Sequence, residues 1–275
     1  MKINLLVCIG ALALASACSC AADGPAPLGS TALAPAGAFD QSHALLDDLL
    51  GQYVKPNGVD YQGLATKSEQ LDTYLAGLQA VQLEEFETWS RDQRFAFWAN
   101  AYNGYILRLI VDSYPVDSIR DLGGKIWGRV WDHELIPLSH LAPDIDHELL
   151  SFNDVEHVIL RPTFKDARVH SAVNCASASC PPLATSAFVA ETLDQQLEAA
   201  MSGFVQDTTR NHLNQKDGEL ELSSIFDWFG EDFIRDEGSV KDYIKHFAGE
   251  RGGDWIDDAD VSFLDYSWDL NDASE

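Results

Sequence analysis

Residues 91–115 read RDQRFAFWANAYNGYILRLIVDSYP, and this stretch carries the strongest helical pattern in the chain. Ser90 and Gln93 form a capping box that would begin the helix, and Pro115 would end it. Between these signals, apolar side chains recur at helical spacing and form one wide stripe: Trp98, Ala101, Tyr102, Tyr105, Ile106, Leu109 and Ile110. A stripe of this width predicts that the helix is buried.

Two asparagines lie on this predicted helix. Asn100 and Asn103 are three residues apart, so their side chains project from neighbouring positions. Buried amides need hydrogen-bond partners. Two interpretations are therefore open: the amides tie down neighbouring loops, or they position a substrate or a catalytic group.

The rest of the chain mixes helices and strands without the regular alternation of a doubly wound sheet. Capping residues and apolar spacing predict further helices at about 42–53, 66–78, 151–160, 187–204 and 239–247. Extended segments are predicted at 128–138, 167–174, 219–223 and 261–266. The fold class that follows is α+β. We expect a single mixed domain over residues 39–275, with several helices packed on a small, mostly antiparallel sheet.

The first residues have the composition of a secretory signal. Lys2 precedes an apolar run at residues 5–15, and small residues lead to Cys18. The end of this run, ASAC, resembles a bacterial lipobox, with Ala15 where leucine is usual. We therefore expect residues 1–17 to be a lipoprotein signal peptide and lipidated Cys18 to anchor the protein to a membrane.

Residues 18–38 are small and rich in proline and glycine, which predicts a flexible tether. The expected location is the cell envelope, with the protein facing the periplasm. Ordinary cleavage after Ala17 would instead give a secreted, soluble protein.

The chain is strongly acidic, with 44 Asp and Glu against 18 Lys and Arg and a net charge of −26. Such a surface repels a phosphate backbone, so nucleic acid is not an expected partner. The ordinary meaning of this excess is a solvated surface. The expected partners are the membrane, through Cys18, and an unknown peptide or small-molecule ligand.

Residues 169–183, VHSAVNCASASCPPL, hold the side chains with the most chemistry. Cys175 and Cys180 are the only cysteines of the predicted body, because the other three fall in the signal or at its processing site. A disulfide between them requires the chain to turn over residues 176–179. Alternatively, both cysteines are small buried hydrophobic residues.

A cysteine nucleophile is the third interpretation, and it needs a base and a group that orients the base. On a strand, His170 and Cys175 would be about 16 Å apart and on opposite faces. His170 could serve Cys175 only if the strand breaks near Asn174. His157, on the predicted helix 151–160, is an equally good base, with Glu156 beside it as the orienting group.

A metal site is the fourth interpretation. His157, His170, Cys175 and Cys180 could supply four ligands to zinc, but their spacing matches no standard zinc motif. Phosphate-cradling glycine loops are absent from the sequence as well. We therefore predict neither a metal nor another cofactor.

Several of these segments together resemble the family called domain of unknown function 547. The similar elements, in chain order, are FWANAYN at 97–103, Val155-Glu156-His157 with Leu160-Arg161, Arg168 and His170 with Cys175 and Cys180-Pro181-Pro182-Leu183, an aromatic pattern at 222–233, and the closing Tyr266, Trp268, Leu270 and Asn271. The resemblance covers about residues 90–271. It implies an exported protein or lipoprotein without a settled activity. It also implies that one polar cluster is built from Asn100, Asn103, Glu156, His157, Arg161, His170, Cys175 and Cys180.

Two functional hypotheses follow. The first is a thiol-dependent hydrolase or acyltransferase that acts on peptide or amide bonds in the cell envelope. Its roles would be Cys175 as nucleophile, His170 or His157 as base, Glu156 as orienting group, Asn100 or Asn103 at the oxyanion, and Arg161 and Cys180 in binding. The alternative is a non-enzymatic lipoprotein that binds a ligand or partner, with Cys175 and Cys180 disulfide-bonded or buried.

Overall fold

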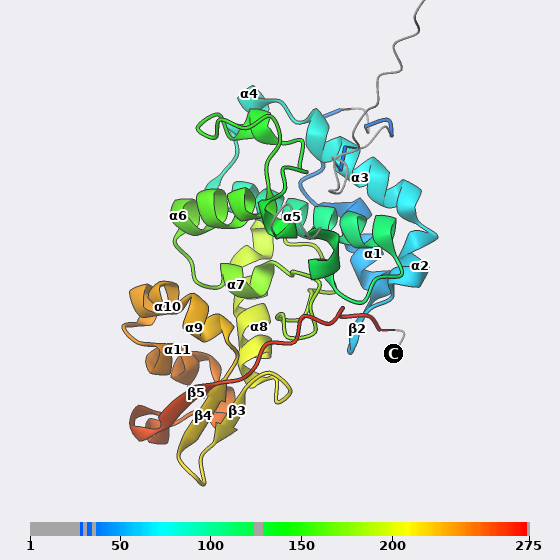
Figure 1. The fold of residues 1–275 in the computed structure, drawn as a ribbon. Coiled ribbons are helices and arrows are strands. Elements are labelled where there is room, and N and C mark those ends of the chain that lie inside the picture. Colours follow the sequence, from blue (N-terminus) through cyan, green and yellow to red (C-terminus); the bar gives the residue numbers. More distant parts are fainter. Residues whose placement is uncertain (1–27, 30–31, 35–36, 124–128, 274–275) are drawn as a thin grey trace, which may run out of the picture.

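The computed structural model describes residues 28–29, 32–34, 37–123 and 129–273. Helix α5 (Arg91–Ser113) lies at its centre (Figure 1). The predicted capping box is present, because the Gln93 N–H donates to Ser90 Oγ at 3.1 Å and the Ser90 N–H donates to Gln93 Oε1 at 2.9 Å. Residues 95–107 are all buried, so protein surrounds the helix on every side. This confirms the prediction of a buried helix.

Short helices cover α5. Those that precede it in the chain are α1 (Ala44–Tyr53), α2 (Tyr61–Ala65), α3 (Ser68–Ala80) and α4 (Leu83–Phe86). A π-helical segment, Asp154–Leu160, also packs against α5 and continues into α6 (Arg161–Phe164). The helical path passes through Pro162, where the sequence predicts an end, because proline is tolerated in the first turn of a helix.

The C-terminal part has its own apolar core. Its elements are α8 (Leu193–Gln206), β3 (His212–Asn214), β4 (Glu219–Leu222), α9 (Ile225–Trp228), α10 (Gly230–Glu237), α11 (Val240–Phe247) and β5 (Asp260–Phe263). Strand β4 pairs antiparallel with β3 and parallel with β5. Strands β1 (Val54–Lys55) and β2 (Gly58–Val59) form a separate antiparallel hairpin.

The prediction of an α+β fold with several helices is confirmed. In the described part of the chain the strands form two small sheets at the edges of the molecule, and the main core is packed between helices (Figure 1). The physical reason is α5. A helix that is buried all round needs neighbours on every side, and the short helices before and after it supply them.

Two segments predicted to be extended contain helical turns instead. Residues 167–174 hold α7 (Val169–Ala172), and the chain becomes extended only at Val173. In 128–138, residues 130–132 form a 3₁₀ turn and Ile136 makes an isolated bridge to Leu150; Gly128 lies outside the described residues. Apolar runs this short do not have enough repeats to distinguish a period of 2 from a period of 3.6.

After β5 the chain leaves the C-terminal part of the molecule. The segment 264–272 runs back across the molecule to β2, as the red trace in Figure 1 shows. The Val59 N–H donates to the Asn271 carbonyl at 2.8 Å, and Asn271 Oδ1 accepts from the Tyr61 hydroxyl at 2.7 Å. On the way, Ser177 and Leu270 form an antiparallel bridge. This closing segment therefore ties the N-terminal and C-terminal parts together.

The predicted signal peptide and Cys18 lie outside the described residues. Leu28, which belongs to the predicted tether, is buried, and its N–H donates to the Leu135 carbonyl at 2.8 Å. At this residue the chain is anchored to the body rather than flexible. None of the helices in the described part of the chain has the length and apolarity needed to span a membrane.

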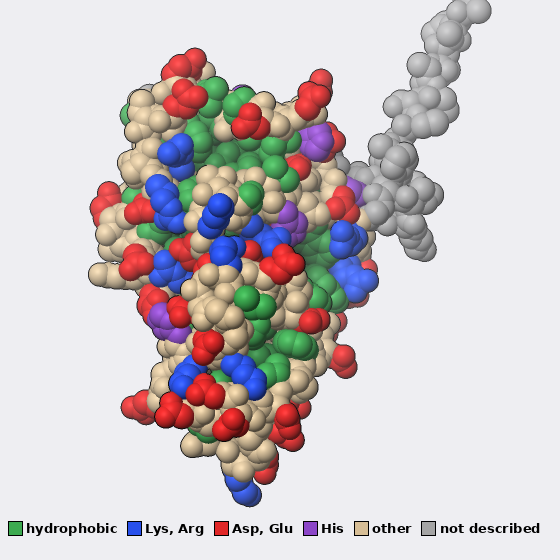
Figure 2. Space-filling view, turned by 90° about the vertical axis from the view of Figure 1, so that its left-hand side faces the viewer, with side chains coloured by type: hydrophobic (Ala, Val, Ile, Leu, Met, Phe, Trp, Pro, Cys, Tyr) green, Lys and Arg blue, Asp and Glu red, His purple; other side chains and the backbone are tan. Residues whose placement is uncertain are grey.

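Figure 2 shows one face of the molecule, on which acidic side chains are spread over the upper and lower parts. The Lys and Arg side chains of this face gather mainly in a band across its middle. Arg161 and Arg168 are both paired with aspartates at 2.7–2.8 Å. At these two positions, aspartates therefore neutralise the basic side chains.

Candidate functional site

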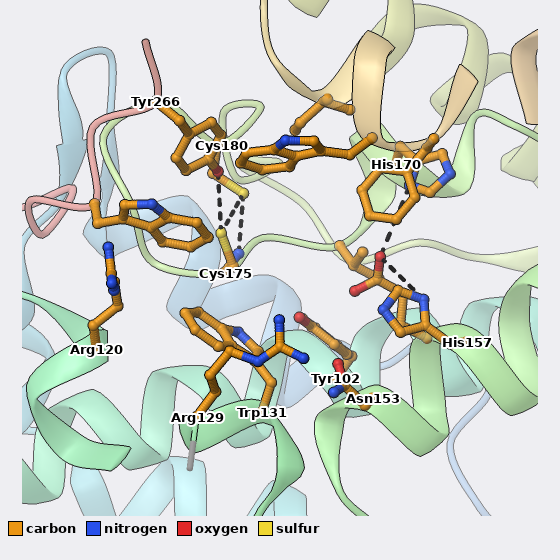
Figure 3. Close-up of a pocket in the computed structure, with 16 residues that line it drawn as sticks. Tyr102, Arg120, Arg129, Trp131, Asn153, His157, His170, Cys175, Cys180 and Tyr266 are labelled. Carbon is orange, nitrogen blue, oxygen red and sulfur yellow. Dashed lines mark hydrogen bonds and ion pairs between the residues drawn. The ribbon is translucent and has the colours of Figure 1, made fainter. Parts of the chain in front are cut away.

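A cavity of about 550 Å³ lies between the core around α5 and the C-terminal core. Figure 3 shows the side chains that line it. Of the eight polar residues predicted to cluster, five line this cavity: Glu156, His157, His170, Cys175 and Cys180. The cavity is therefore the candidate functional site.

The chain turns sharply between the two cysteines. Ala176 adopts a left-handed conformation with φ of 59°, and the Cys180 N–H donates to the Ser177 carbonyl at 3.0 Å. The turn brings the Sγ atoms of Cys175 and Cys180 to 3.1 Å, and both thiols are free. The turn needed for proximity is thus present, whereas the disulfide is not formed.

Hydrogen bonds from two side chains to backbone groups hold this turn. Asn174 Nδ2 donates to the Pro181 carbonyl at 2.8 Å, and Asn174 Oδ1 accepts from the Ala176 N–H at 2.8 Å. The Arg210 guanidinium donates to the carbonyls of Cys180 at 2.7 Å and Ala178 at 2.8 Å. A turn with this many fixed groups presents its thiols in one geometry.

Three groups surround the Cys175 sulfur. Cys180 Sγ and Ser177 Oγ each lie at 3.1 Å, and the Tyr266 hydroxyl lies at 3.3 Å. Hydrogen bonds from Cys180 first, and then from Ser177 and Tyr266, hold the pKa of the Cys175 thiol below its usual range, although burial opposes them. Burial, and then the hydrogen bond to Cys175, raise the pKa of Cys180 well above its usual range. The negative charge therefore resides on Cys175.

His170 does not serve either cysteine. Its Nε2 lies 2.8 Å from Asp232 Oδ2, and its ring stacks on Phe229 with centroids 4.1 Å apart. Among the described residues, no histidine is hydrogen-bonded to Cys175 or Cys180. The expected opposition of His170 and Cys175 on a strand is wrong because the segment is helical, but a direct pair is not formed either. Burial lowers the pKa of His170, so the ring is neutral at pH 7.

Asp232 is a partner that sequence patterns did not single out for this role. Its carboxylate accepts hydrogen bonds from His170, from Arg161 Nε at 2.7 Å and from Arg235 at 2.7 Å. Burial would raise the pKa of Asp232, but these bonds hold it well below the usual range. Arg161, predicted to bind a ligand, is thus engaged behind the pocket wall, with its guanidinium 4.9 Å from the Phe229 ring centre.

Glu156 lies between two histidines. Its Oε1 is 3.8 Å from His170 Nδ1 and 3.9 Å from His157 Nδ1. Burial, and then the negative charge of Cys175, raise the pKa of Glu156 to about 7. Burial, and then the charge of Arg161, lower the pKa of His157 to about 4. At neutral pH the titrating group of this cluster is therefore the carboxyl rather than an imidazole.

Asn100 and Asn103 do not reach the cavity. Asn100 exchanges two hydrogen bonds with the Phe188 backbone, at 2.8 and 3.0 Å. Asn103 donates to the Ala172 carbonyl at 2.8 Å and accepts from the Asn174 N–H at 2.9 Å. Because backbone groups already engage both amides, neither is placed to hold an oxyanion. The interpretation that they tie down loops is the one that fits.

A zinc site also does not fit the arrangement. Cys175 and Cys180 share the turn, whereas His170 is held by Asp232 and His157 lies 3.3 Å from Arg161 Nη1. In the described ranges, no group of three or more His, Cys, Asp and Glu side chains is placed to hold a metal ion.

Several pocket residues were not predicted as site residues. Tyr266 and Trp268 line the cavity and belong to the closing pattern. Ser177 lies in the stretch 169–183 and contacts Cys175 Sγ at 3.1 Å. A search for hydroxyl donors in these motifs would have found Ser177 and Tyr266. Arg120 and Arg129 follow no recognisable pattern. Their position depends on the path of the loop between α5 and the π-helical segment.

The fold and the cavity together define an α+β protein whose central pocket holds a thiol pair and a buried carboxyl. Residues 86–205 match the model of the family described as "Protein of unknown function, DUF547". This match confirms the resemblance over residues 86–205, whereas the similar elements at 222–233 and 266–271 lie beyond it. The matched range includes α5, Glu156, His170 and both thiols, whereas Tyr266 lies beyond it. No curated protein and no solved structure matches the chain.

Proposed function

We propose that the protein is a thiol-dependent hydrolase or acyltransferase that acts on peptide or amide bonds, with Cys175 as the nucleophile. The observation that carries the proposal is the Cys175 sulfur, which borders a cavity of about 550 Å³ and is stabilised as a thiolate by Cys180, Ser177 and Tyr266. The thiolate is the reactive form of cysteine, and a lowered pKa makes it available at neutral pH.

In the proposed reaction, the thiolate attacks the carbonyl carbon of the amide. A C–S bond forms, and the carbonyl oxygen gains the negative charge. When this intermediate collapses, the C–N bond breaks and the leaving nitrogen takes a proton. A thioester remains on Cys175, and water or a second amine then displaces the thiol.

Glu156 is the proton donor in this scheme. Its pKa of about 7 allows it to give a proton to the leaving nitrogen and then to accept one from the attacking water or amine. The nearest nitrogen atoms of His170 and His157 lie 3.8 and 3.9 Å from the carboxyl, beyond hydrogen-bond distance. This assigns to Glu156 the acid–base role that the sequence suggested for a histidine.

The envelope location is part of the same proposal. Cys18 would carry the lipid anchor, and Leu28 is the point at which the described chain joins the body. Nine residues lie between them, so ten steps along the chain would keep the body within about 35 Å of the membrane surface. The substrates would then be peptides or small amides that reach this surface.

The test uses a peptide that carries a thiol-reactive electrophile at its carbonyl end, applied to the full chain. We expect labelling of wild-type protein with half-maximal rate well below the pH of about 8.5 at which a free cysteine titrates. The Cys175→Ala variant should not be labelled at the pocket. The matched Cys180→Ala variant should still be labelled at Cys175, with its midpoint moved to higher pH because one donor is lost.

The Glu156→Gln variant tests the role of the proton donor separately from the role of the thiol. This variant should be labelled as fast as wild type, yet it should not turn over amide substrates, because glutamine cannot transfer the proton. Labelling of Cys175→Ala as strong as that of wild type would refute Cys175 as the nucleophile.

A further inference from the structure

The pocket wall differs in charge from the rest of the molecule. In a chain with 44 acidic and 18 basic residues, the side chains around the cavity include two arginines, Arg120 and Arg129, and one carboxyl, that of Glu156. Because the pKa of Glu156 is about 7, its negative charge is incomplete at neutral pH. The remaining negative charge is the thiolate, which its three donors already stabilise.

Neither arginine is engaged by a short ion pair. The Arg120 guanidinium lies 5.5 Å from the Trp268 ring centre, and in the described part of the chain no carboxylate pairs with it. Arg129 contacts Asp132 only at 3.4 Å, and its side chain is 75% exposed. Asp132 is also the acceptor for Asn153. An arginine that stacks on a ring keeps its N–H edge free for a carboxylate.

Aromatic rings form the surface next to these arginines. Trp131 lies 5.1 Å from Trp268 between ring centroids, and Trp228 stacks nearly parallel to Trp268 at 6.0 Å and 12°. Tyr266 packs on Trp228 at 4.8 Å. Trp228 is 48% exposed, although burial of so large an apolar side chain is favourable. Such rings offer a flat apolar ligand a surface on which to stack.

The two features occur on the same side of the cavity. Figure 3 shows Arg120 at the left, Arg129 and Trp131 in the lower middle with Cys175 above Trp131, and His170 at the right. A ligand that spans the cavity would therefore meet the rings and the arginines at one end and the thiolate along its length. The cavity volume of about 550 Å³ suits a ligand the size of a short peptide.

We infer that the pocket binds amides that end in a flat ring and a carboxylate, as a peptide or an N-acyl conjugate does when its last residue is an aromatic amino acid. The ring stacks on the tryptophans, and the carboxylate accepts hydrogen bonds from Arg120 and Arg129. The amide carbonyl that precedes this residue then faces Cys175. Only this last statement rests on the proposed function, because the binding site itself requires no catalysis.

The binding test uses N-acetyl-L-tryptophan and its neutral match, N-acetyl-L-tryptophanamide, titrated by calorimetry into the full chain carrying Cys175→Ala. The two probes differ only in the carboxylate. We expect the acid to bind about tenfold or more tightly than the amide, the range for charge-assisted hydrogen bonds. High salt should reduce this preference, because both arginines are exposed.

Arg120→Gln and Arg129→Gln should each weaken binding of the acid and leave binding of the amide unchanged. Arg91→Gln removes the same charge from an exposed pair with Asp92 outside this cavity and should keep the wild-type preference. Trp228→Ala should weaken both probes to the same degree. Circular dichroism melting of each variant checks that these exposed changes leave the fold intact.

Three results would overturn the inference: equal affinity of the acid and the amide, a preference for the acid that survives loss of both arginines, or no measurable binding of either probe. Because the titrated chain lacks Cys175, these results do not depend on turnover. If the labelling experiment fails, Cys175 is not the nucleophile, but the proposed binding site still stands. If the binding experiment fails, Cys175 can still be the nucleophile, but aromatic amino acid conjugates are not its substrates.

Discussion

At the scale of single residues, Cys175 and Cys180 show that neighbours rather than residue type decide acidity. The two thiols touch at 3.1 Å, yet the pKa of Cys175 is lowered and that of Cys180 is raised. Cys175 receives additional hydrogen bonds from Ser177 and Tyr266, and burial keeps the proton on Cys180. The sequence could identify the cysteine pair, but it could not predict which thiol has the lower pKa. One of the groups that lower the pKa of Cys175 is Tyr266, which lies 91 residues away in the chain.

This asymmetry predicts how the pair reacts with hydrogen peroxide. The Cys175 thiolate attacks one peroxide oxygen, so an S–O bond forms, the O–O bond breaks and hydroxide leaves. The Cys180 thiol then attacks the Cys175 sulfur. The S–S bond forms, and the hydroxyl leaves as water with the Cys180 proton. The two thiols are oxidised and the peroxide is reduced.

Both cysteines fall in one tryptic peptide, residues 169–210, so mass spectrometry reads the outcome directly. We expect this peptide to lose two hydrogens, and dithiothreitol to restore them. In Cys180→Ser the reaction should stop at the sulfenic acid, which dimedone traps. Persistent sulfenic acid in the wild-type chain would show that Cys180 does not reach Cys175.

At the scale of elements, α5 organises the site although it contributes only Tyr102 to the cavity wall. Asn100 and Asn103 leave the helix as neighbours and hold two different loops, one at Phe188 and one at Ala172–Asn174. Spacing along the helix was enough to predict that they are adjacent. It could not predict the partners, because these come from segments at least 69 residues away.

Substitutions of Asn100 and Asn103 can be compared directly, because both side chains hold backbone groups but only one lies next to the thiol turn. Asn100→Ala and Asn103→Ala should each lower the free energy of unfolding by about 2 kcal/mol, since each leaves a buried backbone carbonyl and N–H without a partner. Only Asn103→Ala should also slow labelling of Cys175 at neutral pH, because Asn103 holds the backbone directly before the thiol turn.

Urea unfolding measures the first effect and the peptide electrophile the second. If both variants slow labelling equally, the loss reflects stability in general rather than the position of the turn.

At the scale of the whole molecule, the cavity joins segments that are distant in the chain. Motifs predicted Glu156, His157, His170 and the two cysteines, because residues of these types are few and chemically distinct. They did not predict that Trp131 and Trp228 would line the cavity. Tryptophans are ordinary core residues in a sequence, and only the path of the closing segment leaves these rings on the surface of a cavity.

The stability of the whole molecule in acid should depend in part on the protonation of His43. His43 is buried at the start of α1, with Nδ1 2.9 Å from the Tyr74 hydroxyl. Its Nε2 has no hydrogen-bond partner among the described residues. Burial lowers the pKa of His43 to about 4, because the cost of burying the charged ring outweighs the attraction of the Asp40 carboxylate.

The sign follows from proton binding. In the unfolded chain His43 titrates at its usual pKa of 6.5, so between pH 6.5 and about 4 the unfolded state binds more protons than the folded state. Stability from this residue is full above pH 6.5 and falls as the pH drops, by about 3 kcal/mol in total. Glu156 acts in the opposite sense, because its pKa is raised and its contribution is lost as the pH rises toward 7.

The contribution of His43 can be isolated as the difference in unfolding free energy between wild type and a variant that lacks this histidine. Urea unfolding of wild type and His43→Leu should be measured at a series of pH values from about 7 to about 4. His43→Leu removes the hydrogen bond to Tyr74, so it should be less stable than wild type at pH 7. The gap should then narrow as the pH falls, because only wild type loses the contribution of His43. Two curves that stay parallel over this range would show that His43 accepts its proton without a cost to the fold.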